Sequence, residues 1–242
     1  MNKLGVANWK AAPATLEDAR DLARNLLKIK TDSVGVVICP PMPFFEEISR
    51  ELSGSKFILG AQDVAPGAER GQTGEETAEM LVGLGVKYII VGHSERRWNL
   101  GESDEIVKQK LISALAVGLT PIVCLGEKTR EVGWEDFLRV QTKSALASLD
   151  ESEINKCVLA YEPVWAISTN PGAQADTPES ASAAVKIILQ EISGHPKILY
   201  GGSVNPENAK TFLSNQVFNG VLVGGASLNA DDFSEIVSAA KD

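Results

Sequence analysis

The sequence has few of the residues that build metal centres or disulfide frameworks. Its 242 residues include three cysteines and two histidines. Cys39, Cys124 and Cys157 are far apart, each lies in or beside an apolar run, and no CxxC motif or Cys/His cluster occurs. We therefore expect three buried, reduced thiols, and not a zinc site, a redox pair or a disulfide-stabilised miniprotein.

Long apolar runs and targeting signals are also lacking. No apolar run approaches the roughly 18 residues of a membrane span, and the N-terminal MNKLGVANWK has no signal-peptide pattern. No Ser/Gly/Pro-rich linker or long charge run marks a domain boundary. We therefore expect a cytoplasmic protein without a membrane partner, with a single domain over residues 1–242.

The chain has fewer basic residues than acidic residues. The 23 Lys and Arg residues face 32 Asp and Glu residues, which gives a formal net charge of -9. An acidic chain is a poor binder of nucleic acids and anionic membranes, so an anionic ligand would need a local pocket. The hydrophobic content of 44% and the charged content of 23% exclude a mostly disordered chain and a collagen.

Eight short apolar runs, rich in β-branched residues, recur along the whole chain. They lack the polar alternation of a half-buried strand, which is typical of a parallel sheet covered on both faces. The runs are Leu4–Ala7, Val34–Cys39, Phe57–Ala61, Val86–Val91, Leu119–Leu125, Cys157–Tyr161, Lys197–Tyr200 and Gly220–Val223.

Helical patterns lie between these runs. Helix-start signals occur at Thr177-Pro178, at Asn205-Pro206 and at Thr15-x-x-Asp18, which resembles a capping box. Eight alternating units predict an α/β fold that closes as a single-domain (β/α)8 barrel, the TIM barrel. An open doubly wound sheet is the alternative, but no GxGxxG motif follows the first run. The helical ranges are Leu16–Ile29, Glu105–Val117, Asp136–Leu149, Ser180–Ile192 and Phe233–Ala240.

Three side chains that could take part in catalysis directly follow predicted strands, which is where the catalytic residues of barrel enzymes lie. Lys10 follows the first strand and is a candidate cation. His93 follows the fourth at a predicted helix start, whose positive potential keeps an imidazole neutral and able to donate to a carbonyl oxygen. Glu162 follows the sixth among apolar residues, and burial makes a carboxylate more basic, as a general base requires. Position alone leaves an alternative for each residue: Lys10 could be solvated, His93 could be structural, and Glu162 could be paired to Lys or Arg.

Two Gly-Gly turns follow the last two predicted strands, Gly201-Gly202-Ser203 and Gly224-Gly225. Glycine lets backbone N–H groups approach an anion, and phosphate sites in barrels often lie after strands seven and eight. The alternative is a pair of tight turns. The segment Ala166–Asp176 is long enough to act as a lid. A base, a neutral electrophile, a cation and a phosphate site together predict proton abstraction next to a carbonyl group in a small phosphorylated substrate.

The chain resembles the triosephosphate isomerase family along nearly its whole length. GHSERR, YEPVW and YGGSV in this order make the resemblance very specific. The matching segments are Asn8-Trp9-Lys10, Cys39-Pro40-Pro41, Ala61-Gln62-Asp63, Thr73-Gly74-Glu75, Gly92-His93-Ser94-Glu95-Arg96-Arg97, Cys124-Leu125-Gly126-Glu127, Tyr161-Glu162-Pro163-Val164-Trp165-Ala166-Ile167, Tyr200-Gly201-Gly202-Ser203-Val204 and Gly224-Gly225-Ala226-Ser227-Leu228.

The resemblance implies interconversion of dihydroxyacetone phosphate and D-glyceraldehyde 3-phosphate through an enediol(ate), in glycolysis or gluconeogenesis, with no metal or organic cofactor. It implies Glu162 as base, His93 as electrophile, and Lys10 and Asn8 as substrate-binding groups. It also implies a homodimer. The other residues that it implies are Ser168, Gly202, Ser203, Gly224 and Gly225 for phosphate, Ser94, Glu95 and Tyr200 as supporting groups, and Thr73, Glu75 and Arg96 at the dimer interface.

The sequence departs from the family pattern in three places. The lid normally reads AIGTGK after the tryptophan. Here it is a few residues longer, and Ser168 replaces a glycine whose backbone N–H contacts phosphate. Ala11 and Ala12 stand where larger interface residues are common, which would weaken the dimer. The stretch Gly126–Gln141 is shortened, which we interpret as trimming of the surface. The alternative functions are another phosphate-binding barrel and a phosphometabolite-binding barrel whose catalysis is weak or altered because of the atypical lid.

Overall fold

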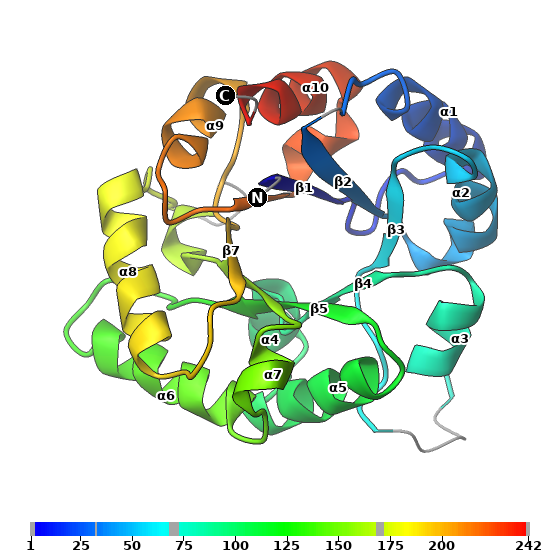
Figure 1. Ribbon diagram of the computed structural model, residues 1–242. Helices are drawn as coiled ribbons and strands as arrows, with labels where there is room; N and C mark the ends of the chain where they lie inside the picture. Colours follow the sequence, from blue (N-terminus) through cyan, green and yellow to red (C-terminus); the bar gives the residue numbers. More distant parts are fainter. Residues whose placement is uncertain (1–2, 32, 68–72, 168–171, 241–242) are drawn as a thin grey trace.

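The computed structural model describes residues 3–31, 33–67, 73–167 and 172–240. Within these ranges eight parallel strands follow one another in sequence order and close into a barrel, with the last strand paired to the first (Figure 1). The predicted (β/α)8 fold is confirmed. Among the helices in these ranges, none combines the length and the apolar composition of a membrane span.

All eight predicted strands are present, three of them with the predicted bounds. They are β1 (Lys3–Asn8), β2 (Val34–Cys39), β3 (Ile58–Ala61), β4 (Tyr88–Val91), β5 (Thr120–Leu125), β6 (Val158–Tyr161), β7 (Lys197–Tyr200) and β8 (Gly220–Val223). Four strands start one or two residues later than predicted, and before β4 and β5 the reason is that an apolar residue is hydrogen-bonded back to the preceding helix. The Val86 N–H donates to Leu81 O, and the Leu119 N–H donates to Ala114 O.

Helices surround the strands (Figure 1). The described residues form α1 (Leu16–Leu26), η1 (Met42–Phe44), α2 (Phe45–Leu52), α3 (Ala78–Gly83), α4 (Ser94–Asn99), α5 (Asp104–Ala116), α6 (Trp134–Leu146), α7 (Glu151–Ile154), η2 (Val164–Ala166), α8 (Pro178–Gln190), α9 (Pro206–Leu213), η3 (Gly225–Leu228) and α10 (Ala230–Ala239). The five predicted helices are α1, α5, α6, α8 and α10. The predicted caps are also confirmed, because Thr15, Thr177 and Asn205 each accept a hydrogen bond from the first turn of a helix.

Strand residues alternate between two apolar clusters. One contains strand residues only and therefore fills the barrel interior, and the other joins strands to helices. In β6, Val158 and Ala160 belong to the interior cluster, and Glu162 is the next residue in that series. The Glu162 N–H donates to Leu125 O at 2.8 Å, so the ladder continues past the strand. The period of two thus places the Glu162 side chain on top of the core.

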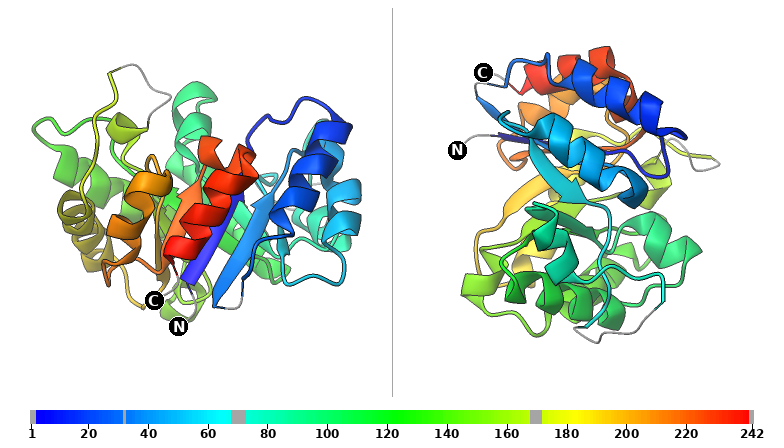
Figure 2. Two further views of the ribbon diagram at one scale, coloured as in Figure 1. Left: turned by 90° about the horizontal axis from the view of Figure 1, so that it is seen from above. Right: turned by 90° about the vertical axis from the view of Figure 1, so that its right-hand side faces the viewer.

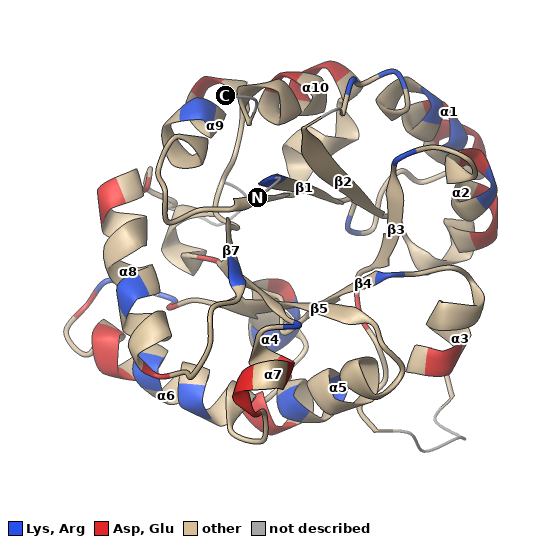
Figure 3. Cartoon of the chain, viewed as in Figure 1, with Lys and Arg blue, Asp and Glu red and all other residues tan. Residues whose placement is uncertain are grey.

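The two ends of the barrel differ in which ends of the strands they contain. β1 begins and α10 ends at the same end, as the left view of Figure 2 shows. The carboxyl ends of the strands lie at the other end, because all strand pairs are parallel. Charged residues of both signs are spread over the outer helices (Figure 3). The carboxyl end of the barrel is therefore the part of the fold that positions a site.

Candidate active site

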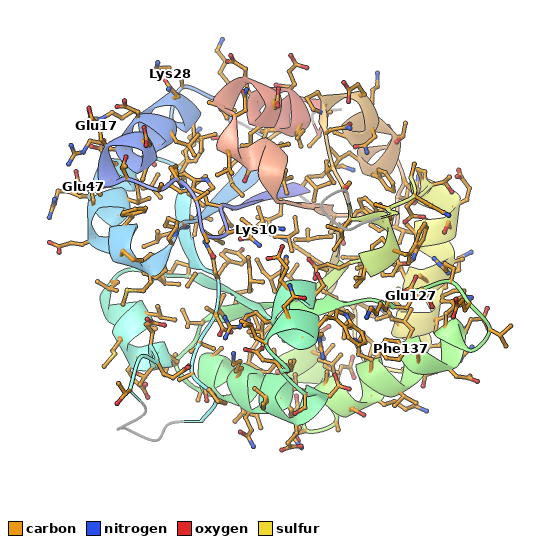
Figure 4. The ribbon with its side chains drawn as sticks, turned by 180° about the vertical axis from the view of Figure 1, so that it is seen from behind. Lys10, Glu17, Lys28, Glu47, Glu127 and Phe137 are labelled. Atoms are coloured by element: carbon orange, nitrogen blue, oxygen red, sulfur yellow. The ribbon has the colours of Figure 1, made fainter. Side chains whose placement is uncertain are left out.

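A cavity of about 430 Å³ opens at the carboxyl ends of the strands. A larger hollow of about 550 Å³ lies between α1 and α10 and contains none of the predicted catalytic residues. Figure 4, which views the molecule from behind, shows Lys10 over the centre of the barrel and Glu17, Lys28 and Glu47 on its outside. Eight predicted site residues line the 430 Å³ cavity: Asn8, Lys10, His93, Glu162, Gly202, Ser203, Gly224 and Gly225.

Lys10 has a left-handed backbone that its neighbours hold in place. Its φ of 55° costs a non-glycine residue about 1–3 kcal/mol. The Lys10 N–H donates to Asn8 Oδ1 at 3.0 Å, and Gln62 Nε2 donates to Lys10 O at 2.8 Å. Gln62 also donates to Cys39 O and so ties the ends of β1 and β2 together. Asn8 therefore positions the backbone of Lys10 in addition to lining the cavity.

The Lys10 side chain crosses the mouth of the barrel. Its Nζ lies 2.5 Å from Oε1 of Glu95, a residue that the resemblance implies as a supporting group. A Cβ atom at Gly224 would lie 3.1 Å from Lys10 Cε, so the glycine leaves room for this path. Both partners are partly exposed, so the pair fixes the direction of the side chain more than it adds stability.

His93 is the N-cap residue of α4, as the predicted helix start requires. Its Nδ1 accepts a hydrogen bond from the Glu95 N–H at 3.2 Å. A ring nitrogen that accepts carries no proton, so this hydrogen bond assigns the proton of a neutral imidazole to Nε2. Nε2 lies 3.1 Å from Glu162 Oε1. The electrophile and the base are thus in direct contact.

Glu162 is almost completely buried, with 2% of its surface exposed. Its Oε2 accepts a hydrogen bond from the Ser94 N–H at 3.0 Å. Glycines give it room, because a Cβ at Gly126 would lie 1.8 Å from Glu162 O and a Cβ at Gly201 would lie 2.8 Å from its Cγ. The carboxylate is therefore held by α4 and enclosed by backbone.

The three cysteines are buried and free, as predicted. Cys124 lies under the base, where burial and the negative charge of Glu162 raise the pKa of the thiol. Burial also raises the pKa of Cys39 and raises that of Cys157 to about 12. All three thiols thus remain protonated at neutral pH and act as small apolar groups.

The two glycine turns border the cavity, and the first of them lies beside Glu162 at Gly201. The Asn208 side chain donates to Ser203 O at 2.8 Å and fixes the first turn. Tyr200 lies beneath this turn, stacked on Phe212 at 3.7 Å between ring centroids. A Cβ at Gly202 would lie 2.3 Å from the Tyr200 hydroxyl oxygen, so only glycine fits over this ring.

Ser168 lies outside the described residues, but both flanks of the predicted lid are described. Ile167 lines the cavity. The Gln174 N–H donates to Trp165 O at 3.1 Å, which joins the two flanks. Asp176 contacts the Tyr200 hydroxyl, and burial raises the pKa of the Asp176 carboxyl.

The predicted interface residues lie away from the cavity. Thr73 and Glu75 are exposed in the segment before α3. Arg96 is held within its own chain, 2.7 Å from Asp63 Oδ2 and 2.6 Å from Glu102 Oε1. Among the described residues, the structure therefore brings the catalytic and phosphate-binding candidates together and leaves these three residues apart from them.

Sequence reasoning missed the supporting roles of Gln62, Glu127 and Arg130. Gln62 and Glu127 follow β3 and β5 closely, so the signal that identified Lys10 and His93 was present for them too. Glu127 is buried, and its Oε1 accepts hydrogen bonds at 2.8 Å from Tyr161 and from Trp165. Arg130 lies in a loop and has no comparable signal in the sequence.

Comparison with known proteins agrees with the site. A family model described as triosephosphate isomerase matches residues 3–240. A triosephosphate isomerase of Caldanaerobacter subterraneus subsp. tengcongensis is 40% identical over 242 residues, covering 96% of each chain. Those of Herminiimonas arsenicoxydans and Aquifex aeolicus are 40% and 38% identical and cover 98% of this chain and 99% of their own. The chain belongs to the triosephosphate isomerase family.

Proposed function

We propose that the cavity interconverts dihydroxyacetone phosphate and D-glyceraldehyde 3-phosphate by proton transfer in which Glu162 is the base. The observation that carries this assignment is the direct contact of Glu162 Oε1 with His93 Nε2, at 3.1 Å. Lys10 and the two glycine turns line the same cavity. The site thus offers a base, a hydrogen-bond donor, a cation and room for a phosphate group.

The first step removes a proton from the carbon next to the carbonyl group. Glu162 takes the proton, the C–H electron pair forms the new C=C bond, and the carbonyl oxygen takes up the negative charge. The carboxylate is buried and held by the Ser94 N–H. A base that is already oriented and dehydrated makes this transfer easier than it is in water.

The charge on the oxygen is stabilised by His93 and Lys10. His93 Nε2, which carries the proton of the neutral imidazole, lies 3.1 Å from Glu162 Oε1. We infer that the carbonyl oxygen of the substrate accepts a hydrogen bond from Nε2, which leaves the carboxylate available for the carbon. Donors that are fixed before the reaction need no reorganisation when the charge develops.

The second step returns the proton to the neighbouring carbon. Protonated Glu162 donates it there, while His93 moves a proton between the two oxygens. The net reaction exchanges a ketone for an aldehyde and leaves every group of the site in its starting state. Glu95 keeps Lys10 directed at the oxygens through the 2.5 Å ion pair.

The phosphate group occupies the side of the cavity formed by Gly202, Ser203, Gly224 and Gly225. Backbone N–H groups in glycine turns approach an anion closely because no Cβ intervenes. Asp232 lines the same cavity and opposes a dianion, which limits how tightly the product is held. Ser168 would add a backbone N–H from the lid, as the resemblance implies.

We also propose a cytoplasmic homodimer in which the segment that contains Thr73 and Glu75 meets a second copy. Its exposure in the single chain is what such an interface requires. Arg96 would meet the partner with an orientation that Asp63 and Glu102 already fix.

The experiment compares Glu162→Gln with the unchanged protein in turnover of glyceraldehyde 3-phosphate and in binding of 2-phosphoglycolate, a phosphorylated carboxylate. Loss of a general base lowers kcat by a factor of about 10²–10⁴. We expect such a loss, with 2-phosphoglycolate binding kept. Turnover that survives the substitution would contradict the assignment of the base. A folded, unchanged protein that binds 2-phosphoglycolate without turnover would favour the binding-barrel alternative.

A further inference from the structure

Arg130 lies between two tryptophans in the segment that joins β5 to α6. Its Cζ is 3.7 Å from the ring centroid of Trp134 and 5.4 Å from that of Trp165. Both distances are within the range of a cation–π interaction, which is worth about 0.5–2 kcal/mol. Trp134 is the first residue of α6, so this contact holds the guanidinium plane against a fixed helix.

The polar atoms of Arg130 contact the chain both before and after residues 166–179. Its Nε lies 2.9 Å from Glu127 Oε1, the atom to which Trp165 Nε1 donates. Its Nη2 donates to Ser180 Oγ at 3.1 Å and to Ser180 O at 3.3 Å. One guanidinium group therefore joins the point where the chain leaves the barrel after β6 to the first turn of α8.

The same contacts reach the residue next to the base. Arg130 Nη2 donates to the Tyr161 hydroxyl at 3.0 Å, and this hydroxyl donates to Glu127. The Val164 N–H donates to Glu127 O at 3.0 Å. Tyr161 immediately precedes Glu162. Movement of Arg130 or Glu127 would thus shift the segment that carries the base.

Charge explains why an arginine is required. Glu127 is 1% exposed, and a buried carboxylate without a cation is strongly unfavourable. Arg130 supplies that cation, and it also attracts the partly buried carboxylate of Asp176. Arginine offers a planar fork that can stack and donate to several acceptors at once, which lysine cannot.

We propose that Arg130, held by Trp134, is a positioning residue that fixes Val164–Ile167 relative to Glu162. Ile167 lines the cavity, so this segment places an apolar side chain beside the reacting carbons. The proposal rests on the proposed function, and Arg130 itself does not touch substrate. Its effect is to limit loss of phosphate from the enediolate.

That loss is a defined competing reaction. The C–O bond to phosphate breaks, inorganic phosphate leaves with the bonding electron pair, and the remaining enol becomes methylglyoxal. Isomerisation instead returns the proton to carbon. The ratio of phosphate released to isomer formed therefore reports how well the enediolate is enclosed, independently of how much folded protein is present.

The test measures this ratio, kcat and KM for Arg130→Met, Arg130→Lys and Trp134→Leu. We expect Arg130→Met to raise the ratio about fivefold and to lower kcat about tenfold, with a smaller change in KM. Arg130→Lys should lie between it and the unchanged protein, and Trp134→Leu should shift the ratio in the same direction. The matched control is Arg139→Met on α6, where Arg139 pairs with Glu191 at 3.0 Å and should leave the ratio unchanged.

Three outcomes decide the proposal. A ratio in Arg130→Met equal to that in Arg139→Met, with both proteins folded, overturns it. If Arg130→Met does not fold, then unchanged ratios in Arg130→Lys and Trp134→Leu overturn it. A raised ratio in the Arg130 and Trp134 variants alone supports it. Failure of the proposed function is a separate result, because it shows as turnover that survives Glu162→Gln.

Discussion

Lys110 offers a quantitative test of how the barrel tolerates buried charge. Its side chain, on α5, is 2% exposed, and Nζ lies 2.6 Å from Asp63 Oδ2 and 2.5 Å from Glu102 Oε1. Arg96 contacts the same two carboxylates, so two cations balance two anions. Lys110→Met leaves one cation for two partly buried carboxylates. Breaking a buried pair in this way costs about 3–5 kcal/mol of the free energy of unfolding.

The loss of stability in Lys110→Met should depend on pH, and the direction of this dependence follows from the pKa of Asp63. Burial raises the pKa of Asp63 to about 6, against 3.8 for the free side chain. Because the native state binds this proton more tightly than the unfolded chain does, protonation stabilises the native state. This stabilisation is complete below pH 3.8 and is lost as the pH rises through about 6. Lys110 lowers the pKa of Asp63, so its removal raises this pKa further and lets the variant recover stability on acidification.

The assay is urea unfolding at fixed protein concentration, at about pH 7.5 and about pH 5. The control is Lys108→Met on the same helix, which removes an exposed ion pair with Glu105 and should leave the free energy of unfolding almost unchanged at either pH. We expect the difference between the two variants to shrink by about 1–2 kcal/mol from the higher to the lower pH. Equal stabilities at pH 7.5, or a difference that grows on acidification, would refute this reasoning.

Two further predictions concern the cavity. In Gly202→Ala the new methyl group meets the Tyr200 hydroxyl at 2.3 Å, and the ring cannot move freely because it is stacked on Phe212, so we expect kcat/KM to fall about tenfold in an isomerase assay. Gly83→Ala, with no atom within 4 Å of its Cβ, should leave kcat/KM unchanged. Asp232→Asn removes a negative charge from the cavity, so we expect the KM for the phosphorylated substrate to fall about twofold at low salt, and the gain to shrink as salt is added. A salt-independent KM in the Asp232 variant would argue against a charge effect.

Patterns that are local in sequence predicted the strands and the residues that follow them. Strands were visible because parallel strands are apolar on both faces. Glu162 was visible because it directly follows the sixth apolar run, whereas Asn8 was named only from the resemblance. The start of α4 at Ser94 was visible from its polar residues. The hydrogen bond from the Glu95 N–H to His93 Nδ1 places the proton on Nε2. This bond depends on the orientation of the side chain and could not be predicted from the sequence.

Pairings between distant parts of the chain could not be predicted. Lys110 lies in an amphipathic helical pattern, where a lysine indicates an exposed face, yet its partner Asp63 is 47 residues earlier. Arg130 pairs with Ser180 across 50 residues. Helix α2 was missed because it begins after a proline-containing 3-10 turn, and Phe44 makes no side-chain cap. The placement of Thr73 and Glu75 at a dimer interface stays a prediction from the resemblance.

The pairing of β8 with β1 has a consequence for synthesis. β1 is the first strand to be made and β8 the last, so one edge of β1 stays without its partner until residues 220–223 have been added. Chains grow at about 5–20 residues per second, which exposes that edge for many seconds. The glycine turn after β8 also arrives last, so a truncated copy would carry both an open edge, prone to pair with other chains, and an incomplete cavity. Closure of the ring thus protects the newly made chain and completes its site in a single event.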